Sequence, residues 1–487
     1  MKHLLPSQEA REVVKLNLKA ITFIKNMSYS LSSNFLSLVI STVVVLIIPK
    51  LIGVESYGYW QLYIFYSSYA AYTHFGRNDG IYLRYGGEEY RNLDKKLFFS
   101  QFLELLVSQL IIGGFIFLYS IFLVDDPNRS FIWKMIAIIL VILNVRIMLY
   151  FILQATNRIK EYARLTMLDR LVYIFLIILF LLLGIRNFKI MILADVIGKL
   201  TSLIFAMILC RDIVFNRLSS FYFTLTETLT NIKVGISLMF ASIASTLIIG
   251  IVKFGIEKNW DVATFGKISL TLSISNMMML FINAVGVIIF PVLRRTSREK
   301  LSSIYLIIRD LLMAVLLGVL VFYYPLKALM SAWLPQYADS LLYMALAFPM
   351  FTYEGKVSLL INTYLKTLRK EKLIMRVNII SMILSVILTI IAVMVIDNLV
   401  LAILNIVVLL AFKAALAEYF VAKELNIQVI KDILMETIMT IIFISSGWYI
   451  DSWMTVLIYG TAFIIYLFIK KNSLKESFDG MRMLLKE

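Results

Sequence analysis

Two cations inside long apolar stretches, Arg146 and Lys356, are the residues whose spacing points most directly to a chemistry. Residues 133–161 align with residues 343–371 without a gap at an offset of 210, and this alignment places Arg146 on Lys356. A charge near the centre of a bilayer costs roughly 2.5–3.5 kcal/mol on insertion scales. One cation in each of two equivalent helices predicts a symmetric pair of lobes that face a shared cationic cavity. Such a cavity is typical of a transporter for an anion.

Two more cations within apolar stretches, Lys199 and Lys413, complete the set of candidate substrate-binding cations. Lys199 follows Asp195 by four residues, so that the two side chains share a helix face and can form an internal ion pair. Lys413 precedes Glu418 by five residues, a spacing that does not place them on one face. Both a contact with substrate and a structural role therefore stay open for these lysines.

The matched cations have the same structural alternative. Glu354 lies near Lys356, and Glu104 on the third expected span is a partner within reach of Arg146. A structural ion pair is then an alternative to substrate contact at both positions. The acids that could titrate if transport is coupled to an ion are Glu104, Asp195, Glu354 and Glu418.

A glycine-rich loop after the second expected span carries three arginines, Arg77, Arg84 and Arg91. Arg77 and Arg84 are seven residues apart, which is two helical turns and one face. They are candidates for collecting an anionic head group at the cytoplasmic mouth. An ordinary basic loop that holds anionic lipid is the alternative.

Aromatic and basic side chains near the membrane surfaces give two further candidate sites. Tyrosine rings stack on sugars and their hydroxyls bond sugar hydroxyls, although an interfacial aromatic belt would have the same composition. Lysines at the end of a helical hairpin can close an outer gate or simply extend to the interface. The candidate sugar-stacking residues are Tyr59, Tyr63, Tyr66 and Tyr69, and the candidate outer-gate residues are Lys253 and Lys267.

These residues must be positioned by membrane helices. The chain has 487 residues, of which 61% are hydrophobic, and a mean hydropathy of +0.87. Apolar runs of about 20 residues separated by short polar loops predict an all-α polytopic membrane protein. The expected spans number about fourteen: 28–48, 57–76, 98–123, 131–153, 166–185, 188–209, 234–254, 264–290, 303–324, 340–362, 374–396, 398–420, 432–450 and 453–470.

The distribution of Lys and Arg predicts the orientation. With the N-terminus in the cytoplasm, 34 of the 47 Lys and Arg fall in inner segments, nine at the outer side and four inside spans. The positive-inside rule then places both termini in the cytoplasm. It also accounts for most of the net charge of +16, so that we expect no nucleic-acid partner. Residues 7–25 have an apolar stripe flanked by lysines and predict an amphipathic helix in the plane of the inner leaflet, with a disordered leader as the alternative.

A second repeat signal extends the internal symmetry. Ser41-Thr42 and Ser245-Thr246 each precede an apolar run that ends at a lysine, after which a Tyr-Gly or Phe-Gly pair starts the next helix. Parallel repeats of this kind surround a binding site between two lobes. The expected domains are a cytoplasmic amphipathic leader (1–27), an N-terminal lobe of spans 1–6 (28–210), a linker (211–233), a C-terminal lobe of spans 7–12 (234–421), and spans 13–14 with a tail (422–487).

The chain has no recognisable cofactor or metal motif. It contains one cysteine and two histidines, and it lacks a phosphate-binding glycine loop and the common hydrolase and zinc signatures. We therefore expect neither a cofactor nor a metal, and no enzymatic activity.

The topology, the buried cations and the loop Gly76–Gly87, which reads GRNDGIYLRYGG, together resemble the polysaccharide transporter family. These proteins are the O-antigen and capsule repeat-unit flippases of the multidrug/oligosaccharidyl-lipid/polysaccharide exporter superfamily. The resemblance implies translocation of an undecaprenyl-pyrophosphate-linked oligosaccharide from the inner to the outer leaflet of a bacterial cytoplasmic membrane by alternating access. It also implies partnership with a polysaccharide polymerase and a chain-length regulator.

Two rival functions remain. A cation-coupled multidrug exporter of the same superfamily would need an acid near the first span of a lobe, and residues 28–48 contain none. A membrane glycosyltransferase or polymerase that acts on lipid-linked sugars would need a catalytic acid or base. The first outer loop, about Lys50–Ser56, offers only Glu55.

Overall fold

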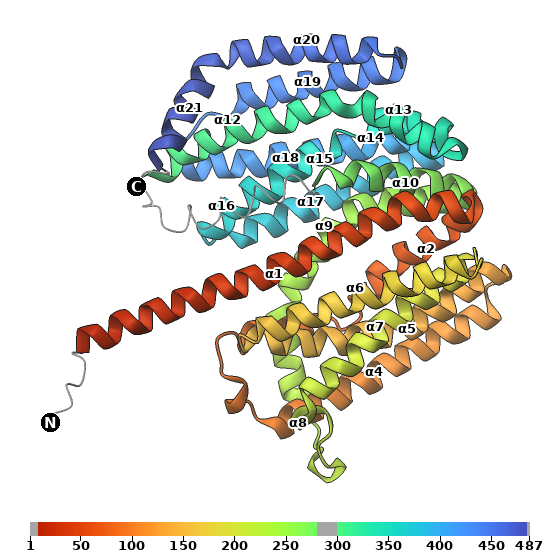
Figure 1. The fold of residues 1–487 in the computed structure, drawn as a ribbon, viewed down its shortest axis with the longest axis vertical. Helices are drawn as coiled ribbons and strands as arrows, with labels where there is room; N and C mark the ends of the chain where they lie inside the picture. Colours follow the sequence, from red (N-terminus) through yellow and green to blue (C-terminus); the bar gives the residue numbers. More distant parts are fainter. Residues whose placement is uncertain (1–7, 280–299, 485–487) are drawn as a thin grey trace. The chain divides into compact units, whose positions relative to one another are not determined.

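The computed structural model of the chain describes residues 8–279 and 300–484, and within these ranges every regular element is helical (Figure 1). Among the described residues, nine helices are long and apolar enough to cross a membrane by length and composition, or ten if the bent pair Met454–Ile469 and Lys471–Arg482 forms one span. The protein is therefore a polytopic helical membrane protein, in which helices satisfy the backbone hydrogen bonds that lipid cannot.

The chain forms two compact units. The first is built from the described parts of Met1–Val44 and Tyr66–Met239, and the second from those of Val45–Phe65 and Phe240–Glu487. The helices that supply residues to the first unit are α1 (Gln8–Ile52), α2 (Val54–Ala70), α3 (Arg77–Arg84), α4 (Lys95–Phe122), α5 (Pro127–Ala155), α6 (Ile159–Leu182), α7 (Phe188–Leu209), α8 (Arg211–Val214) and α9 (Leu225–Asn259), with short 3₁₀ turns η1 (Tyr90–Asn92) and η2 (Leu218–Ser220).

The second unit takes the remaining parts of α1, α2 and α9 and contains the C-terminal half of the chain. Its own elements are α10 (Val262–Met277), α12 (Leu301–Val319), η4 (Leu320–Phe322), α13 (Tyr323–Trp333), η5 (Pro335–Tyr343), α14 (Met344–Ala347), α15 (Met350–Gly355), η6 (Lys356–Ile361), α16 (Asn362–Thr367), α17 (Glu371–Thr389), η7 (Ile390–Val395), α18 (Leu399–Leu425), α19 (Ile430–Tyr449), α20 (Met454–Ile469) and α21 (Lys471–Leu484).

The N-terminal segment differs from the expected separate leader. Helix α1 is continuous over 45 residues, so that residues 8–27 extend the first expected span without a break (Figure 1). Residues 1–7 of the leader and residues 280–290 of the eighth expected span lie outside the described residues.

The segment after α2 is helical rather than a loop. Helix α2 ends at Ala70, and a turn with positive φ at Phe75 and Gly76 leads into the short helix α3. Two glycines of this segment, Gly76 and Gly80, allow α9 to approach closely: a Cβ added at Gly80 would lie 1.9 Å from the carbonyl oxygen of Asn231 on α9. A residue with a side chain would push α9 away, so that glycine is required there.

The tenth expected span, 340–362, is divided into several pieces. A 3₁₀ segment, two short α-helices around Pro349 and a π-helical segment that starts at Lys356 replace one regular helix. Proline lacks the N–H that a helix interior needs, and π-helical turns add residues and are common at functional sites.

This π-helical segment changes the register of the internal repeat. The turn after α5 has Asn157 in the left-handed region and the turn after α16 has Arg369 there, so that the two turns correspond at an offset of 212. The backbone bonds agree, since the N–H of Arg158 bonds the carbonyl of Leu153 and that of Lys370 bonds the carbonyl of Leu365. The ungapped alignment at 210 is thus two residues out of register at its C-terminal end.

Helix α10 begins with a capping carboxylate that supports a pH-dependent prediction. Asp261 Oδ1 accepts a hydrogen bond from the backbone N–H of Thr264 at 2.6 Å. This bond, the Thr264 hydroxyl and the charge of Lys267 hold the pKa of Asp261 below its usual range. We expect Asp261→Ala to lower the free energy of unfolding by about 0.5–2 kcal/mol, whereas Asp261→Asn keeps a cap and changes it little.

The sign of the pH dependence follows from the lowered pKa. The contribution of Asp261 is complete above the unfolded pKa of about 3.9 and is lost as the pH falls through the lower folded pKa. Unfolding temperatures of the wild type and of Asp261→Ala, measured from pH 7 to pH 3, should therefore converge at the acid end. A difference that is constant across this range would contradict a role for the charged cap.

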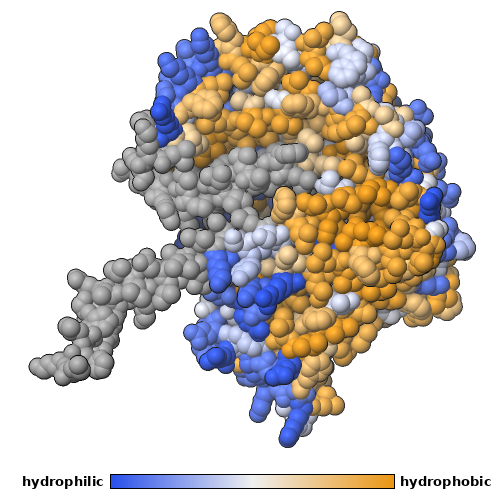
Figure 2. All heavy atoms as spheres, viewed as in Figure 1, coloured by the Kyte–Doolittle hydropathy of each residue, from blue (hydrophilic) through white to orange (hydrophobic). Residues whose placement is uncertain are grey.

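The surfaces of both units are largely apolar, as Figure 2 shows for one face. Phenylalanines such as Phe115 on α4 and Phe175 on α6 are exposed by 70% and 63%. Exposed apolar area on this scale marks a surface that faces lipid rather than water. Some polar and charged side chains are nevertheless buried inside the units, among them Arg146, Arg309 and Lys356.

Candidate functional site

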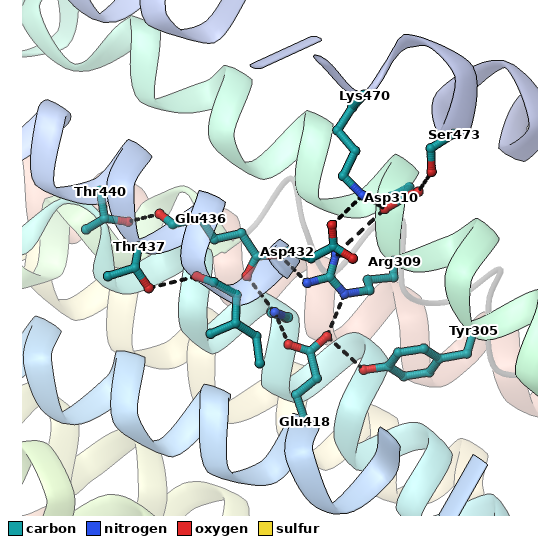
Figure 3. Close-up of polar contacts among 12 residues, drawn as sticks. Tyr305, Arg309, Asp310, Glu418, Asp432, Glu436, Thr437, Thr440, Lys470 and Ser473 are labelled. Atoms are coloured by element: carbon teal, nitrogen blue, oxygen red, sulfur yellow. Dashed lines mark hydrogen bonds and ion pairs between the residues drawn. The ribbon is translucent and has the colours of Figure 1, made fainter. Parts of the chain in front are cut away.

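The second unit contains a closed ring of four charged side chains. The guanidinium of Arg309 bonds Glu418 through Nε and Glu436 through a terminal nitrogen, each at 2.6 Å (Figure 3). The ammonium of Lys356 bonds the second oxygen of Glu436 at 2.6 Å and also bonds Glu418. Each carboxylate thus bridges the two cations, and all four side chains are at most 3% exposed.

A second layer of charges extends this ring toward the C-terminal helices. Lys470, at the end of α20, bonds Asp432 at 2.6 Å and Asp310 at 3.0 Å. Asp432 lies 3.4 Å from Arg309, and the hydroxyl of Ser473 on α21 donates to Asp310. The ring and this layer together join α12, η6, α18, α19, α20 and α21 (Figure 3).

Local spacing in the sequence explains how the helices present these groups. Asp432 and Glu436 are four residues apart on α19, and Tyr305 and Arg309 are four apart on α12, so that each pair shares a face. The Tyr305 hydroxyl donates to Glu418 at 3.2 Å. Lys356 is the first residue of the π-helical segment, which places its side chain between α18 and α19.

The charges of this cluster nearly cancel. The ring is neutral, and the second layer adds two acids and one lysine, giving four carboxylates to three cations. Buried charges are tolerated when paired and hydrogen-bonded, and removal of one partner is strongly destabilising. Lys356 is therefore held in structural ion pairs, which was the alternative to a contact with substrate. Its partners are Glu418 and Glu436 rather than Glu354.

The other candidate lysines of the second unit lack such partners. Lys413 on α18 donates to the Ser245 hydroxyl at 2.9 Å, and Glu354 acts on it electrostatically although no described carboxylate lies within 4.0 Å of it. Lys253 on α9 lies over the rings of Phe65 and Phe265, with its nitrogen 5.3 and 5.2 Å from their centres. Lys267 lies on α10 and acts electrostatically on Asp261.

In the first unit, Arg146 on α5 is paired with a residue of α6. Its NH1 donates to Asp169 Oδ2 at 2.7 Å, and its guanidinium lies 5.1 Å from the ring centre of Tyr150. Within the described residues the buried Nε of Arg146 and Oδ1 of Asp169 have no hydrogen-bond partner. The guanidinium therefore keeps one donor that an additional anion could use.

The neighbouring helix α7 brings a second ion pair close to this one. Lys199 donates to Asp195, as their spacing predicts. A Cβ added at Gly198 would lie 2.9 Å from the backbone oxygen of Asp169, so that glycine allows α6 and α7 to approach closely here. The two pairs therefore occupy adjacent positions on α6 and α7.

The three arginines proposed for cytoplasmic entry are divided between different environments. Arg77 is 4% exposed and bonds the Gln101 carbonyl at 2.6 Å and Glu104 at 3.3 Å. Arg84 bonds Glu227 and Asn231 of α9, each at 2.7 Å, and Arg91 is exposed. Glu104 thus partners Arg77 rather than Arg146.

The four candidate tyrosines all lie on α2, which is divided between the two units. Tyr59 and Tyr63 belong to the second unit, where they are 9% and 1% exposed. Tyr66 and Tyr69 belong to the first unit, and the ring centre of Tyr66 lies 4.7 Å from that of Trp133.

Sequence reasoning missed several members of these clusters. Arg309 lies near the start of an expected span and was counted with the cytoplasmic loop before it, and Asp169 was not considered as the partner of Arg146. A usable signal was present: Asp432 and Glu436 repeat at helical spacing inside an otherwise apolar segment and require cations from elsewhere.

The fold can be compared with solved structures. An inward-facing multidrug resistance MATE family transporter of the MOP superfamily superposes with a TM-score of 0.62 at 12% identity, covering 80% of this chain and 94% of that one. The lipid II flippase MurJ in an inward closed conformation gives a TM-score of 0.59 at 13% identity, covering 92% of this chain and 99% of that one. The chain has the MOP-superfamily transporter fold.

The likeness of this chain to these neighbours lies in the fold and not in the amino-acid sequence. A MATE transporter in complex with MaL6 superposes with a TM-score of 0.50 at 13% identity over 83% of the chain. No family model matches the sequence, and no curated protein matches it either. These neighbours are transporters and a flippase, and what this chain shares with them is the fold.

Proposed function

We propose that this protein is a flippase that moves an undecaprenyl-pyrophosphate-linked oligosaccharide repeat unit from the cytoplasmic to the outer leaflet by alternating access through a cationic cavity. The product would feed O-antigen, capsule or exopolysaccharide synthesis, together with a polymerase and a chain-length regulator. The observation that carries the proposal is the share of this chain, 92%, that superposes on the lipid II flippase.

The lengths of the alignments favour a flippase over a drug exporter. The lipid II flippase covers 92% of the chain and the inward-facing multidrug transporter covers 80%, although nearly all of each neighbour is aligned. The difference, 12% of 487 residues or about 58 residues, is close in size to segment 422–487. The C-terminal helices α19 and α20 lie in this segment.

The pairing of acids also argues against ion-coupled drug export. Three of the four candidate coupling acids, Glu104, Asp195 and Glu418, have a cationic partner in the structure. A carboxylate held by a cation in a buried ion pair is available to a coupling ion only if that pair is broken. This leaves Glu354 as the one candidate without a described cation within 4.0 Å.

The proposed topology has fourteen spans with both termini in the cytoplasm of a bacterial cell, in its cytoplasmic membrane. The distribution of Lys and Arg supports it, since inner segments hold 34 of 47 and outer segments nine. Under this topology Arg84 and Arg91 lie at the cytoplasmic surface, where they would meet the pyrophosphate, and Lys253 and Lys267 lie at the outer end of the α9–α10 hairpin.

Within the cavity we propose different roles for the four cations. Arg146 keeps a free donor and Lys413 is hydrogen-bonded only to a hydroxyl, so that both can donate to a phosphate oxygen without loss of an existing ion pair. Lys199 and Lys356 are held by carboxylates and would contact the substrate only when a conformational change releases them. Tyr59, Tyr63, Tyr66 and Tyr69 on α2 are the proposed sugar-stacking residues.

A leaflet-accessibility assay tests the function. The purified protein is reconstituted with a fluorescent undecaprenyl-pyrophosphate glycan, and an impermeant glycosidase or lectin reports the fraction that crosses. We expect protein-dependent crossing of the pyrophosphate-linked glycan and none of a phosphatidylcholine analogue. Equal crossing of both would indicate a scramblase, and export of a cationic dye without glycan crossing would favour the drug exporter.

Removal of the Arg146–Asp169 pair separates substrate contact from structure. We expect Arg146→Ala alone to be destabilised, because Asp169 is left buried without its cation. The double variant Arg146→Ala, Asp169→Ala should recover stability to within about 1 kcal/mol, yet flip at least tenfold more slowly because a charge-assisted phosphate contact of about 1.5–3 kcal/mol is lost.

The measurements are the unfolding temperature in detergent and the initial flipping rate in proteoliposomes. The matched control is the double variant Lys327→Ala, Asp451→Asn, which also removes one ion pair but none of the proposed substrate contacts. Flipping at the wild-type rate by the Arg146→Ala, Asp169→Ala variant would show that Arg146 has only a structural role.

A further inference from the structure

An apolar groove of about 420 Å³ lies between α4 and α5 in the first unit. Its walls are formed by eight apolar or small residues, among them Leu110, Gly114 and Phe117 of α4 and Ala137 and Ile138 of α5. Leu110 and Ile138 are 54% and 41% exposed, so that the groove opens on the outer surface of the unit. Both helices qualify as membrane spans, and the groove therefore opens toward hydrocarbon.

Two adjacent glycines create this groove. A Cβ added at Gly113 would lie 2.9 Å from the carbonyl oxygen of Ala137, so that Gly113 allows α4 and α5 to touch. A Cβ added at Gly114 would meet no described atom within 4 Å. Glycine destabilises a helix interior by roughly 1 kcal/mol relative to alanine. At Gly114 no close contact between described helices requires the absence of a side chain, so that helix packing does not explain the glycine there.

One end of the groove has the composition of a lipid head-group site. Lys134 lies on α5 one turn before Ala137 and Ile138, and no described carboxylate lies within 4.0 Å of it. Its neighbour Trp133 packs against Tyr66 and Tyr119, with ring centres 4.7 and 5.4 Å apart. Aromatic clusters of this kind sit at the level of lipid head groups, and a lysine there attracts a phosphate.

The size of the groove selects one class of hydrocarbon. Its α4 wall, from Leu110 to Phe117, extends about 10 Å along the helix axis, which lies within one leaflet of a core about 30 Å thick. A single acyl chain that descends from a head group beside Lys134 fits this length. A long polyprenyl chain exceeds it several times.

We propose that the groove between α4 and α5 is a binding site for an anionic phospholipid, with one acyl chain over Gly114 and the phosphate beside Lys134. The site is independent of the transported substrate, because its residues are not among the cavity cations. It gives the first unit a specific lipid contact on an otherwise uniform apolar surface.

Titration of the detergent-purified full-length protein with phosphatidylglycerol, followed by native mass spectrometry, tests the site. We expect one tightly bound lipid per chain. Gly114→Leu fills the groove and should weaken this binding about tenfold, since roughly two methylene contacts are lost. Lys134→Gln should weaken the binding of phosphatidylglycerol about fivefold. It should change little the binding of a phosphatidylcholine that has the same acyl chains.

The matched control is Gly460→Leu on α20, where an added Cβ also meets no described atom within 4 Å but which does not line this groove. It should bind phosphatidylglycerol as the wild type does. A phosphatidylglycerol that carries a photoreactive group in the middle of one acyl chain should label the wild-type segment 107–120 and label it less in Gly114→Leu. Unchanged binding and labelling in Gly114→Leu would overturn the proposal, as would preferential displacement of the lipid by a polyprenyl phosphate.

Discussion

Replacement of Arg309 by methionine should lower the free energy of unfolding by about 3–5 kcal/mol, because it leaves buried carboxylates without their main cation. Arg309 is fully buried and bonds Glu418 and Glu436 at 2.6 Å each. Without it, Lys356 alone must neutralise both carboxylates. Unfolding followed by tryptophan fluorescence in detergent, together with the amount of protein inserted in the membrane, measures the effect.

Two further variants make this prediction specific. Lys253→Met removes a lysine of the same unit that has no described carboxylate within 4.0 Å, and it should not lower stability because an unpaired charge is itself costly in a span. The double variant Arg309→Met, Glu418→Leu leaves Lys356 paired with Glu436 and should recover much of the loss. Wild-type stability of Arg309→Met would show that the carboxylates are protonated and the ring contributes nothing.

The membrane class and most helices could be predicted because lipid requires long apolar helical runs. Spans such as 131–153 lie within a regular helix, here α5, since their apolar length alone specifies them. The broken segment around Pro349 and the π-helical segment at Lys356 could not be predicted in the same way. The shape of these two segments depends on tertiary contacts, because the Lys356 side chain bonds carboxylates that come from α18 and α19.

The ion pairs of the candidate site could be predicted from the sequence only where both partners lie on one helix. The pair Asp195–Lys199 was readable because both residues lie on one helix face. The contacts of Arg309 with Glu418 and Glu436 span 109 and 127 residues of sequence, and no spacing rule connects residues so far apart. Arg146 stands out because it lies in the middle of an expected span, whereas its partner Asp169 lies near the start of the expected span 166–185, where charges are ordinary.

Under the proposed function, a membrane potential should strongly change the distribution of the lipid-linked glycan between the leaflets if two negative charges move outward without a counter-ion. An interior-negative potential of 100 mV then favours the outer leaflet by about 4–5 kcal/mol, which is roughly a thousandfold in the equilibrium ratio. Imposing this potential with a potassium gradient and a potassium ionophore in proteoliposomes, and measuring glycan accessibility, tests the expectation. The control is the ionophore without a gradient.

Indifference to the potential, combined with a response to a proton or sodium gradient, would show that a co-transported or exchanged ion cancels the charge. The structure then directs attention to Glu354, because Glu104, Asp195 and Glu418 are each held by a cation. Glu354→Gln should abolish the response to the ion gradient and restore dependence on the potential, since the lipid charge would then move alone. Unchanged ion dependence in Glu354→Gln would require one of the three paired acids to release its cation during transport, at the cost of several kcal/mol that separates a buried ion pair.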